Sequence, residues 1–139
     1  MTDAATLEAL HSRAFGHPGA HGWRAGDFET ALTDPGFVVC AREDGYAVAR
    51  RVLDEAELLL IAVVPEARRS GVATALLDAL AAALRAEGVT RLLLEVMEAN
   101  EGAVAFYRAR GFRETGRRAG YYGRGTGHDA QLFEKPLNT

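Results

Sequence analysis

The chain has 139 residues, of which 48% are hydrophobic and 25% are charged, proportions typical of a single globular domain. The net charge of −3 is small and the arginines form no basic stripe, which argues against a nucleic-acid-binding module. The one cysteine, Cys40, excludes an intramolecular disulfide and a cysteine-based metal site. No apolar run reaches the ~18 residues of a membrane span. We therefore expect one cytoplasmic domain over residues 1–139, with no membrane partner.

The first half of the chain predicts two short helices followed by three antiparallel strands. Thr2 or Asp3 can cap a first helix, in which Leu7, Leu10 and Ala14 share one face. A second short helix is expected over residues 27–32. The strands are expected over residues 37–41, 46–52 and 58–64, with turn residues between them.

Three histidines, His11, His17 and His21, come close together in the sequence. The spacing of His17 and His21 would suit a metal pair on a helix, but Pro18 and the neighbouring glycines prevent that helix. We therefore interpret these histidines as loop residues and expect no metal site.

The centre of the chain predicts a strand, a loop and a helix that together can bind an anion. Residues 58–64 read as a buried strand, which Pro65 stops because it has no N–H group for the ladder. The next helix has one apolar face and ends at Gly88. Its first turn has unpaired backbone N–H groups, and Gly71 lets an anion approach them closely. That apolar face is formed by Val72, Leu76, Leu77, Leu80 and Leu84.

The second half predicts an α/β fold with a mixed sheet. Residues 91–96 form a strand that should run parallel to the strand over 58–64, since a right-handed helical crossover joins them. Asn100 caps a helix over 101–110, and a terminal hairpin follows. The fold class is therefore a central, mostly antiparallel sheet with one parallel strand pair, flanked by helices. The hairpin strands are expected over residues 112–115 and 130–134, with a glycine-rich connection over 116–129.

The loop and the second half resemble the GCN5-related N-acetyltransferase (GNAT) family. The segment 68–73, Arg-Arg-Ser-Gly-Val-Ala, fits the family signature Gln/Arg-x-x-Gly-x-Gly/Ala, and the segments 94–100, 105–107 and 111–112 resemble its later motifs. Within the family, the chain is similar to the RimI-type ribosomal-protein-alanine N-acetyltransferases, notably over 52–56 and 117–130. Only Met1 to Ala4 precede the first helix, so the family's first strand is expected to be missing.

The resemblance implies a binding site for acetyl-CoA. Backbone N–H groups of the loop would face its pyrophosphate, with charge added by the side chains of Arg68 and Arg69. The strand before the loop would pair with the pantetheine arm, which requires the strands ending at Val64 and Val96 to splay apart. Asn100 resembles a family asparagine that contacts the cofactor, although capping a helix is an equally good role. The implied backbone contacts are Arg69, Ser70, Gly71, Val72, Ala73 and Thr74 in the loop, and Ile61, Ala62 and Val63 in the strand.

Two side chains are candidates for proton transfer. Glu95 interrupts an apolar strand, where a carboxylate is costly unless it is paired or faces a cavity. The resemblance assigns it as the general base, and its simpler interpretation is a side chain that points to water. Tyr107 matches the family tyrosine that protonates the leaving thiolate; its simpler interpretation is an aromatic packed beside Phe106 in the core, and the two roles are compatible if the hydroxyl reaches the cleft.

The expected activity is acetyl-CoA-dependent N-acetylation of an amine. The resemblance implies the N-terminal α-amine of a protein, such as a small-subunit ribosomal protein, as the acceptor. Acids that could attract its ammonium are Glu43, Asp44 and Glu98. An acetyltransferase for a small amine is one alternative, and a non-catalytic acyl-CoA-binding domain is another. The oligomeric state stays open.

Overall fold

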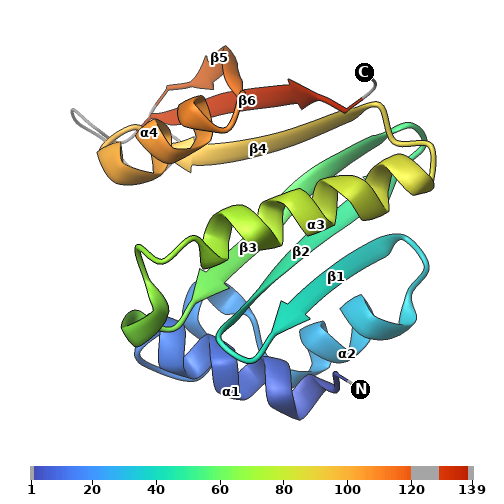
Figure 1. Cartoon of the computed structure of the whole chain (residues 1–139), viewed down its shortest axis with the longest axis vertical. Coiled ribbons are helices and arrows are strands. Elements are labelled where there is room, and N and C mark those ends of the chain that lie inside the picture. The colour runs from blue at the N-terminus through green and yellow to red at the C-terminus, as the bar shows by residue number, and fades with distance from the viewer. Residues whose placement is uncertain (1, 120–128, 138–139) are drawn as a thin grey trace.

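The computed structural model describes residues 2–119 and 129–137, in which one six-stranded mixed sheet is flanked by helices (Figure 1). The strand order is β1-β2-β3-β4-β6-β5, and only β3 and β4 are parallel. The predicted fold class is thus confirmed, and no strand precedes α1 among the described residues. The elements are α1 (Ala4–Phe15), η1 (Ala20–Gly22), α2 (Ala25–Thr33), β1 (Phe37–Arg42), β2 (Gly45–Val52), β3 (Glu55–Val63), η2 (Pro65–Ala67), α3 (Val72–Ala86), β4 (Arg91–Met97), α4 (Glu101–Ala109), β5 (Arg113–Arg118) and β6 (Ala130–Pro136).

Helices cover both faces of the sheet. In Figure 1, α3 crosses the near face of β1, β2 and β3, and α1 and α2 lie behind these strands. One core packs α3 and α4 against the sheet, and a second core packs α1 and α2 against the other face. The longest helix in the described part of the chain, α3, has 15 residues, and none is long and apolar enough to cross a bilayer.

A buried histidine joins α1 to the sheet and to η1. His11 contacts the hydroxyl of Tyr46 on β2, and its Nε2 lies 2.6 Å from the carbonyl oxygen of Ala20. The sequence placed this histidine with the loop histidines, whereas the structure buries it in the second core, where its polar atoms have partners. A fully buried imidazole is stable only when it is hydrogen-bonded in this way.

A β-bulge at Leu59 changes which face of the sheet the residues of β3 occupy. Ala49 pairs with Leu58 and Val48 pairs with Leu60, so Leu59 is one extra residue on β3. Leu58 consequently belongs to the α3 core, whereas Leu60 belongs to the α1 and α2 core. Without the bulge, residues two apart would lie on the same face.

Strands β3 and β4 are paired only at their first residues. The pairs are Glu55 with Arg91, Ala56 with Leu92, and Glu57 with Leu93. Beyond Glu57 the two strands diverge, as Figure 1 shows. The expected splaying of the parallel pair is therefore confirmed. The region between the diverging parts of β3 and β4 is called the slot below.

The terminal hairpin differs from its prediction. Strand β5 runs to Arg118, so Arg117 and Arg118 belong to a strand and not to the connection predicted over 116–129. The segment is rich in charged residues and glycine, so its sequence did not indicate a strand. Strand β5 contains the second bulge of the sheet, at Thr115. Residues 120–128 of the predicted connection lie outside the described residues.

Leu80 is a stringent test of the α3 core, because it is fully buried on the apolar face of the helix. We expect Leu80→Ala to lower the free energy of unfolding by about 3 kcal/mol, since the substitution leaves a cavity. Urea unfolding measures this loss. The matched control is Asp78→Ala, which changes an exposed residue on the same helix. A loss no larger than that of the control would contradict the packing.

Candidate active site

The loop between β3 and α3 turns sharply before the helix begins. Pro65 stops β3, and the Ser70 hydroxyl donates to the Ala67 carbonyl. Arg69 and Gly71 have φ angles of 61° and 87°, in the left-handed region. Gly71 is the N-cap of α3, and a Cβ atom built on it would meet nothing within 4 Å. The glycine therefore leaves open space in front of the helix, at a backbone conformation that other residues adopt only with strain.

The first turn of α3 presents backbone donors to this space. The first intrahelical hydrogen bond is donated by the Ala75 N–H to the Gly71 carbonyl at 3.0 Å. The N–H groups of Val72, Ala73 and Thr74 precede it, and no side chain in the described part of the chain caps the helix. These donors adjoin a cavity of about 400 Å³. Its lining residues are Val63, Ala67, Arg68, Arg69, Gly71, Val72, Ala73, Thr74 and Phe106.

Arg68 lines this cavity, but its guanidinium is engaged in the fold. Its Nε donates to the Val63 carbonyl at 3.0 Å, and its Nη2 donates to the Ala14 carbonyl at 2.6 Å. The second bond ties the loop to the last turn of α1. The sequence predicted that Arg68 and Arg69 add charge for an anion; both residues line the cavity, and their contact with an anion stays a prediction.

Arg110 reaches the same helix turn from the end of α4, and no sequence motif pointed to it. Its Nη1 donates to the Thr74 hydroxyl at 3.2 Å, and its Cζ lies 5.9 Å from the centre of the Phe106 ring. Its Nε is buried without a hydrogen-bond partner among the described residues. A buried donor without an acceptor is costly, so the position suits an anionic group that would accept from it.

The edge of β3 that borders the slot has no partner strand after Glu57 within the described ranges. Ile61, Ala62 and Val63 lie in this unpaired part, as the pantetheine prediction requires. The Val63 carbonyl accepts from Arg68, so that group is already partnered. An extended chain could pair with the remaining backbone groups in the manner of another strand.

Asn100 caps α4, as predicted. Its side-chain oxygen accepts from the Ala103 N–H at 3.2 Å. Capping satisfies one of the four free donors of the helix and fixes where α4 begins. A contact of Asn100 with a cofactor stays a prediction.

Glu95 lies on the face of β4 that points away from α3. Its neighbours Leu94 and Val96 belong to the α3 core, and alternation along the strand turns Glu95 to the other face. There its carboxylate pairs with the Arg118 guanidinium at 3.0 Å. The sequence offered two interpretations for Glu95, burial as a base or exposure to water, and the structure gives it a positively charged partner.

The carboxylate of Glu57 faces the same region as Glu95. Both line a cavity of about 190 Å³ together with Arg118, Thr115 and Leu132. Partial burial raises the pKa of Glu57, the nearby charge of Glu95 raises it further, and the arginines Arg118 and Arg50 oppose these effects. The sequence had proposed Glu43, Asp44 and Glu98 as nearby acids, and none of them lines this cavity. Sequence reasoning missed Glu57 because only the strand register shows that it lies near Glu95.

Tyr107 lies on α4, within the core on the α3 side of the sheet. Its ring packs edge-on against those of Phe106 and Phe112, so the predicted core role is confirmed. Burial raises the pKa of Tyr107 to about 12, so the phenol keeps its proton at neutral pH. Tyr107 and Glu95 thus lie on opposite faces of the sheet.

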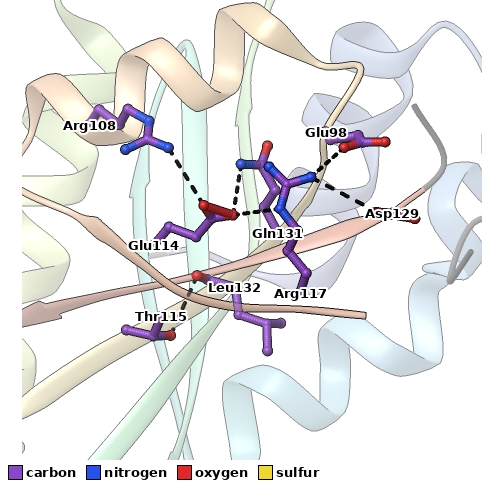
Figure 2. A network of polar contacts seen from close by, with 8 residues as sticks. All are labelled: Glu98, Arg108, Glu114, Thr115, Arg117, Asp129, Gln131 and Leu132. Carbon is purple, nitrogen blue, oxygen red and sulfur yellow. Dashed lines mark hydrogen bonds and ion pairs between the residues drawn. The ribbon is translucent and has the colours of Figure 1, made fainter. Parts of the chain in front are cut away.

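A network around Arg117 holds the end of β5 against α4 and the loop before it (Figure 2). Arg117 pairs with Glu98 at 2.6 Å, with Glu114 at 3.0 Å and with Asp129 at 4.0 Å. The Gln131 amide also donates to Glu114, which lowers the pKa of the Glu114 carboxyl group. Glu98, proposed from the sequence as an acid for the acceptor, thus contributes to this anchor.

Comparison with known proteins agrees with this geometry. The profile of the Acetyltransferase (GNAT) family matches residues 4–112 of the chain. The chain belongs to the GNAT family. The match covers the loop between β3 and α3, both splayed strands and α4, which are the elements beside the slot and the cavity next to α3.

Two GNAT proteins with similar sequences or structures are named for the same activity. The [ribosomal protein bS18]-alanine N-acetyltransferase of Salmonella typhimurium is 40% identical over 98 residues, which are 70% of this chain and 66% of that protein. The chain thus matches just under two thirds of this relative's length. The crystal structure of the ribosomal-protein-S18-alanine N-acetyltransferase from Escherichia coli superposes with a TM-score of 0.80 at 30% identity. That superposition covers 98% of this chain and 88% of the other.

A second similar structure has a different name. Nourseothricin acetyltransferase superposes with a TM-score of 0.66 at 25% identity, over 76% of this chain and 68% of that one. The similarity is lower than for the Escherichia coli protein by all three measures.

Proposed function

We propose that this GNAT protein is an acetyl-CoA-dependent N-acetyltransferase that acts on the N-terminal α-amine of a protein, such as a ribosomal protein. The observation that carries the proposal is the divergence of β3 and β4, which leaves the second half of β3 unpaired on that edge within the described residues and is followed in the chain by the uncapped N-terminus of α3. The similarity to the ribosomal-protein-alanine enzymes supports the acceptor class.

Acetyl-CoA fits the residues on the α3 side of the sheet. Its phosphates would accept from the backbone N–H groups that begin with Arg69 and Ser70 and continue through the first turn of α3. Arg110 supplies a buried guanidinium nitrogen without a partner among the described residues. The pantetheine arm would run along the unpaired edge of β3 at Ile61 to Val63, and its thioester would lie in the slot. Asn100, at the start of α4, would border the arm.

The two candidate catalytic groups would act on the thioester from the two faces of the sheet. The amine nitrogen attacks the thioester carbonyl carbon, the new C–N bond replaces the C–S bond, and the sulfur leaves as a thiolate. Glu95 accepts the proton that the amine loses, and Tyr107 donates a proton to the departing thiolate. What supports this assignment is that Glu95 lines a cavity on one face, where the amine would bind, and Tyr107 lies on the α3 side, where acetyl-CoA would bind.

Acceptor competition tests the function. We expect release of coenzyme A from acetyl-CoA with a peptide that begins with alanine, and much slower release with polyamines, aminoglycosides or free amino acids. A thiol-release assay measures both rates. Faster reaction with a small amine would move the assignment to that alternative, which the likeness to nourseothricin acetyltransferase favours. Acetyl-CoA binding in calorimetry without thiol release from any amine would identify a non-catalytic acyl-CoA-binding domain.

Arg110 gives a separate test of the cofactor site. We expect Arg110→Met to raise the Kd of acetyl-CoA by about tenfold, because a charge-assisted hydrogen bond to a phosphate contributes about 1.5 kcal/mol. Isothermal calorimetry measures the change. Acetyl-dephospho-CoA, which lacks the 3′-phosphate, shows which phosphate is bound: a variant effect that disappears with this analogue assigns Arg110 to the 3′-phosphate.

The matched control for Arg110 is Arg42→Met, which removes the same charge from the end of β1. Its Kd for acetyl-CoA should equal that of the wild type. Equal affinity of the Arg110 variant and this control would remove Arg110 from the site.

A further inference from the structure

Two consecutive arginines on β5 point to opposite faces of the sheet. Arg117 faces α4 and is held there by three carboxylates (Figure 2). Arg118, the next residue, faces the cavity that contains Glu57 and Glu95. The bulge at Thr115 determines this assignment, because one extra residue on β5 exchanges the faces of all residues after it. Arg117 therefore acts as the anchor that directs Arg118 to the Glu95 side.

Among the described residues, the charges that line this cavity are two carboxylates and one guanidinium. Arg118 pairs with Glu95 at 3.0 Å, and its charge also acts on Glu57. The other charged groups near this ion pair, within the described part of the chain, are Glu57 from β3 and, beside Glu57, Arg50 from β2. The proposed reaction uses Glu95 but assigns no role to Arg118. An acceptor ammonium that approaches Glu95 meets a cation already in its place.

We propose that Arg118 determines acceptor specificity. Its guanidinium pairs with Glu95 at the position where the ammonium group of the acceptor would bind, and the ammonium group must displace it; this role of Arg118 is called the gate below. The inference rests on the proposed function, because it takes Glu95 as the group that receives the amine. Arg118 is suited to the exchange because its side chain is 54% exposed, so it can swing into water and be solvated there. Glu57 supports the exchange, since a second negative charge attracts a cation to the cavity. The gate thus weakens binding of cationic acceptors and disfavours neutral ones more strongly, because only an acceptor with its own positive charge can take the place of the guanidinium on Glu95.

Binding of a monocationic amine tests the gate without catalysis. L-alaninamide is titrated into the protein, and chemical shifts of residues around the cavity report its Kd. We expect Arg118→Met to bind this amine about two- to fivefold more tightly than the wild type, since an exposed ion pair no longer has to be broken. Arg118→Lys keeps the charge and should bind like the wild type. Equal or weaker binding by Arg118→Met would overturn the proposal.

Arg113→Met is the matched control, because Arg113 is an exposed arginine on the same strand that pairs with Glu134 instead. Its amine affinity should not change. Tighter binding by this control as well would show that net charge alone explains the effect, and the gate would be rejected.

The titration of Glu57 supplies a second readout that a purely structural role would not move. Arg118 lowers the pKa of Glu57, so its removal should shift the Glu57 carboxyl titration to higher pH, as observed by carbon-13 NMR. The shift is expected in Arg118→Met and absent in Arg118→Lys and Arg113→Met. An unchanged titration in Arg118→Met would mean that the guanidinium does not face the carboxylate pair, and the gate would fail.

Kinetics separate this proposal from the proposed function. If the wild type transfers acetyl groups, Arg118→Met should lower the KM of the amine and leave the KM of acetyl-CoA unchanged. If Arg118→Met instead raises the KM of the amine and the KM of acetyl-CoA and lowers the Tm, Arg118 stabilises the fold, and the gate is rejected. If the wild type transfers nothing to any amine, the proposed function fails, and the L-alaninamide and Glu57 titrations still decide whether Arg118 is displaced by a cation.

Discussion

Replacing Tyr107 by phenylalanine should lower kcat for acetyl transfer by about 10²- to 10³-fold and leave the Kd of acetyl-CoA unchanged. General acid catalysis contributes factors of this size. The phenol is protonated at neutral pH because burial raises the pKa of Tyr107 to about 12, so it is ready to donate to a thiolate. The variant removes one oxygen from a ring that is held by Phe106 and Phe112, which should preserve the packing. Stopped-flow thiol release gives kcat, and calorimetry gives the Kd.

The matched control is Tyr46→Phe, which removes the hydroxyl of another buried tyrosine. Tyr46 contacts His11 in the second core, away from the slot. This variant should lose stability, since the imidazole loses a buried partner, but it should keep its kcat. A wild-type kcat in Tyr107→Phe would eliminate Tyr107 as the proton donor. An equal loss of kcat in both variants would point to a general effect of core damage.

Glu95→Gln should reduce kcat/KM for the amine by about 10²- to 10⁴-fold, because the amide cannot accept the amine's proton. The pH–rate profile carries the more specific signal. A carboxylate base works when it is ionised, so wild-type activity falls as acid protonates it, and glutamine removes this ionisation from the profile. The remaining pH dependence should be that of the amine alone. Arg118 would keep its position beside the neutral amide but lose its ion pair.

Glu55→Gln provides the comparison for Glu95→Gln. Glu55 is a carboxylate near the start of the paired part of β3 and pairs with Arg91, outside the slot. It should retain both the rate and the shape of the wild-type profile. A Glu95→Gln profile with the wild-type acid limb would mean that another group takes the proton. Glu57, which shares the cavity with Glu95, would then be the next residue to change.

The elements of the fold could be predicted from the sequence because each has a local signal. Asp3, Gly71 and Asn100 mark the starts of helices, and the helical crossover determined that β3 and β4 are parallel. The family signature at residues 68–73 predicted where the cavity beside α3 would lie. These features depend on neighbours within a few residues, and such information is present in the sequence.

The details that surround the candidate site could not be predicted, because they depend on strand register. One extra residue at Leu59 and another at Thr115 exchange the faces of β3 and β5, and nothing in the composition of either segment marks a bulge. The strand register places Glu57 and Arg118 next to Glu95, although the three residues are far apart in the sequence. Arg68 illustrates the same limit, because the Ala14 carbonyl that holds it is 54 residues away.

The slot between β3 and β4 also bears on the order of events in a catalytic cycle. If donor and acceptor approach from the two faces of the sheet, neither blocks the other's way in or out. Coenzyme A could then be exchanged while a long polypeptide stays docked, and a folded acceptor would need to present only its first few residues to the opening. Such two-sided access predicts a ternary complex formed in random order. Bound coenzyme A would then set no limit on the size of the acceptor.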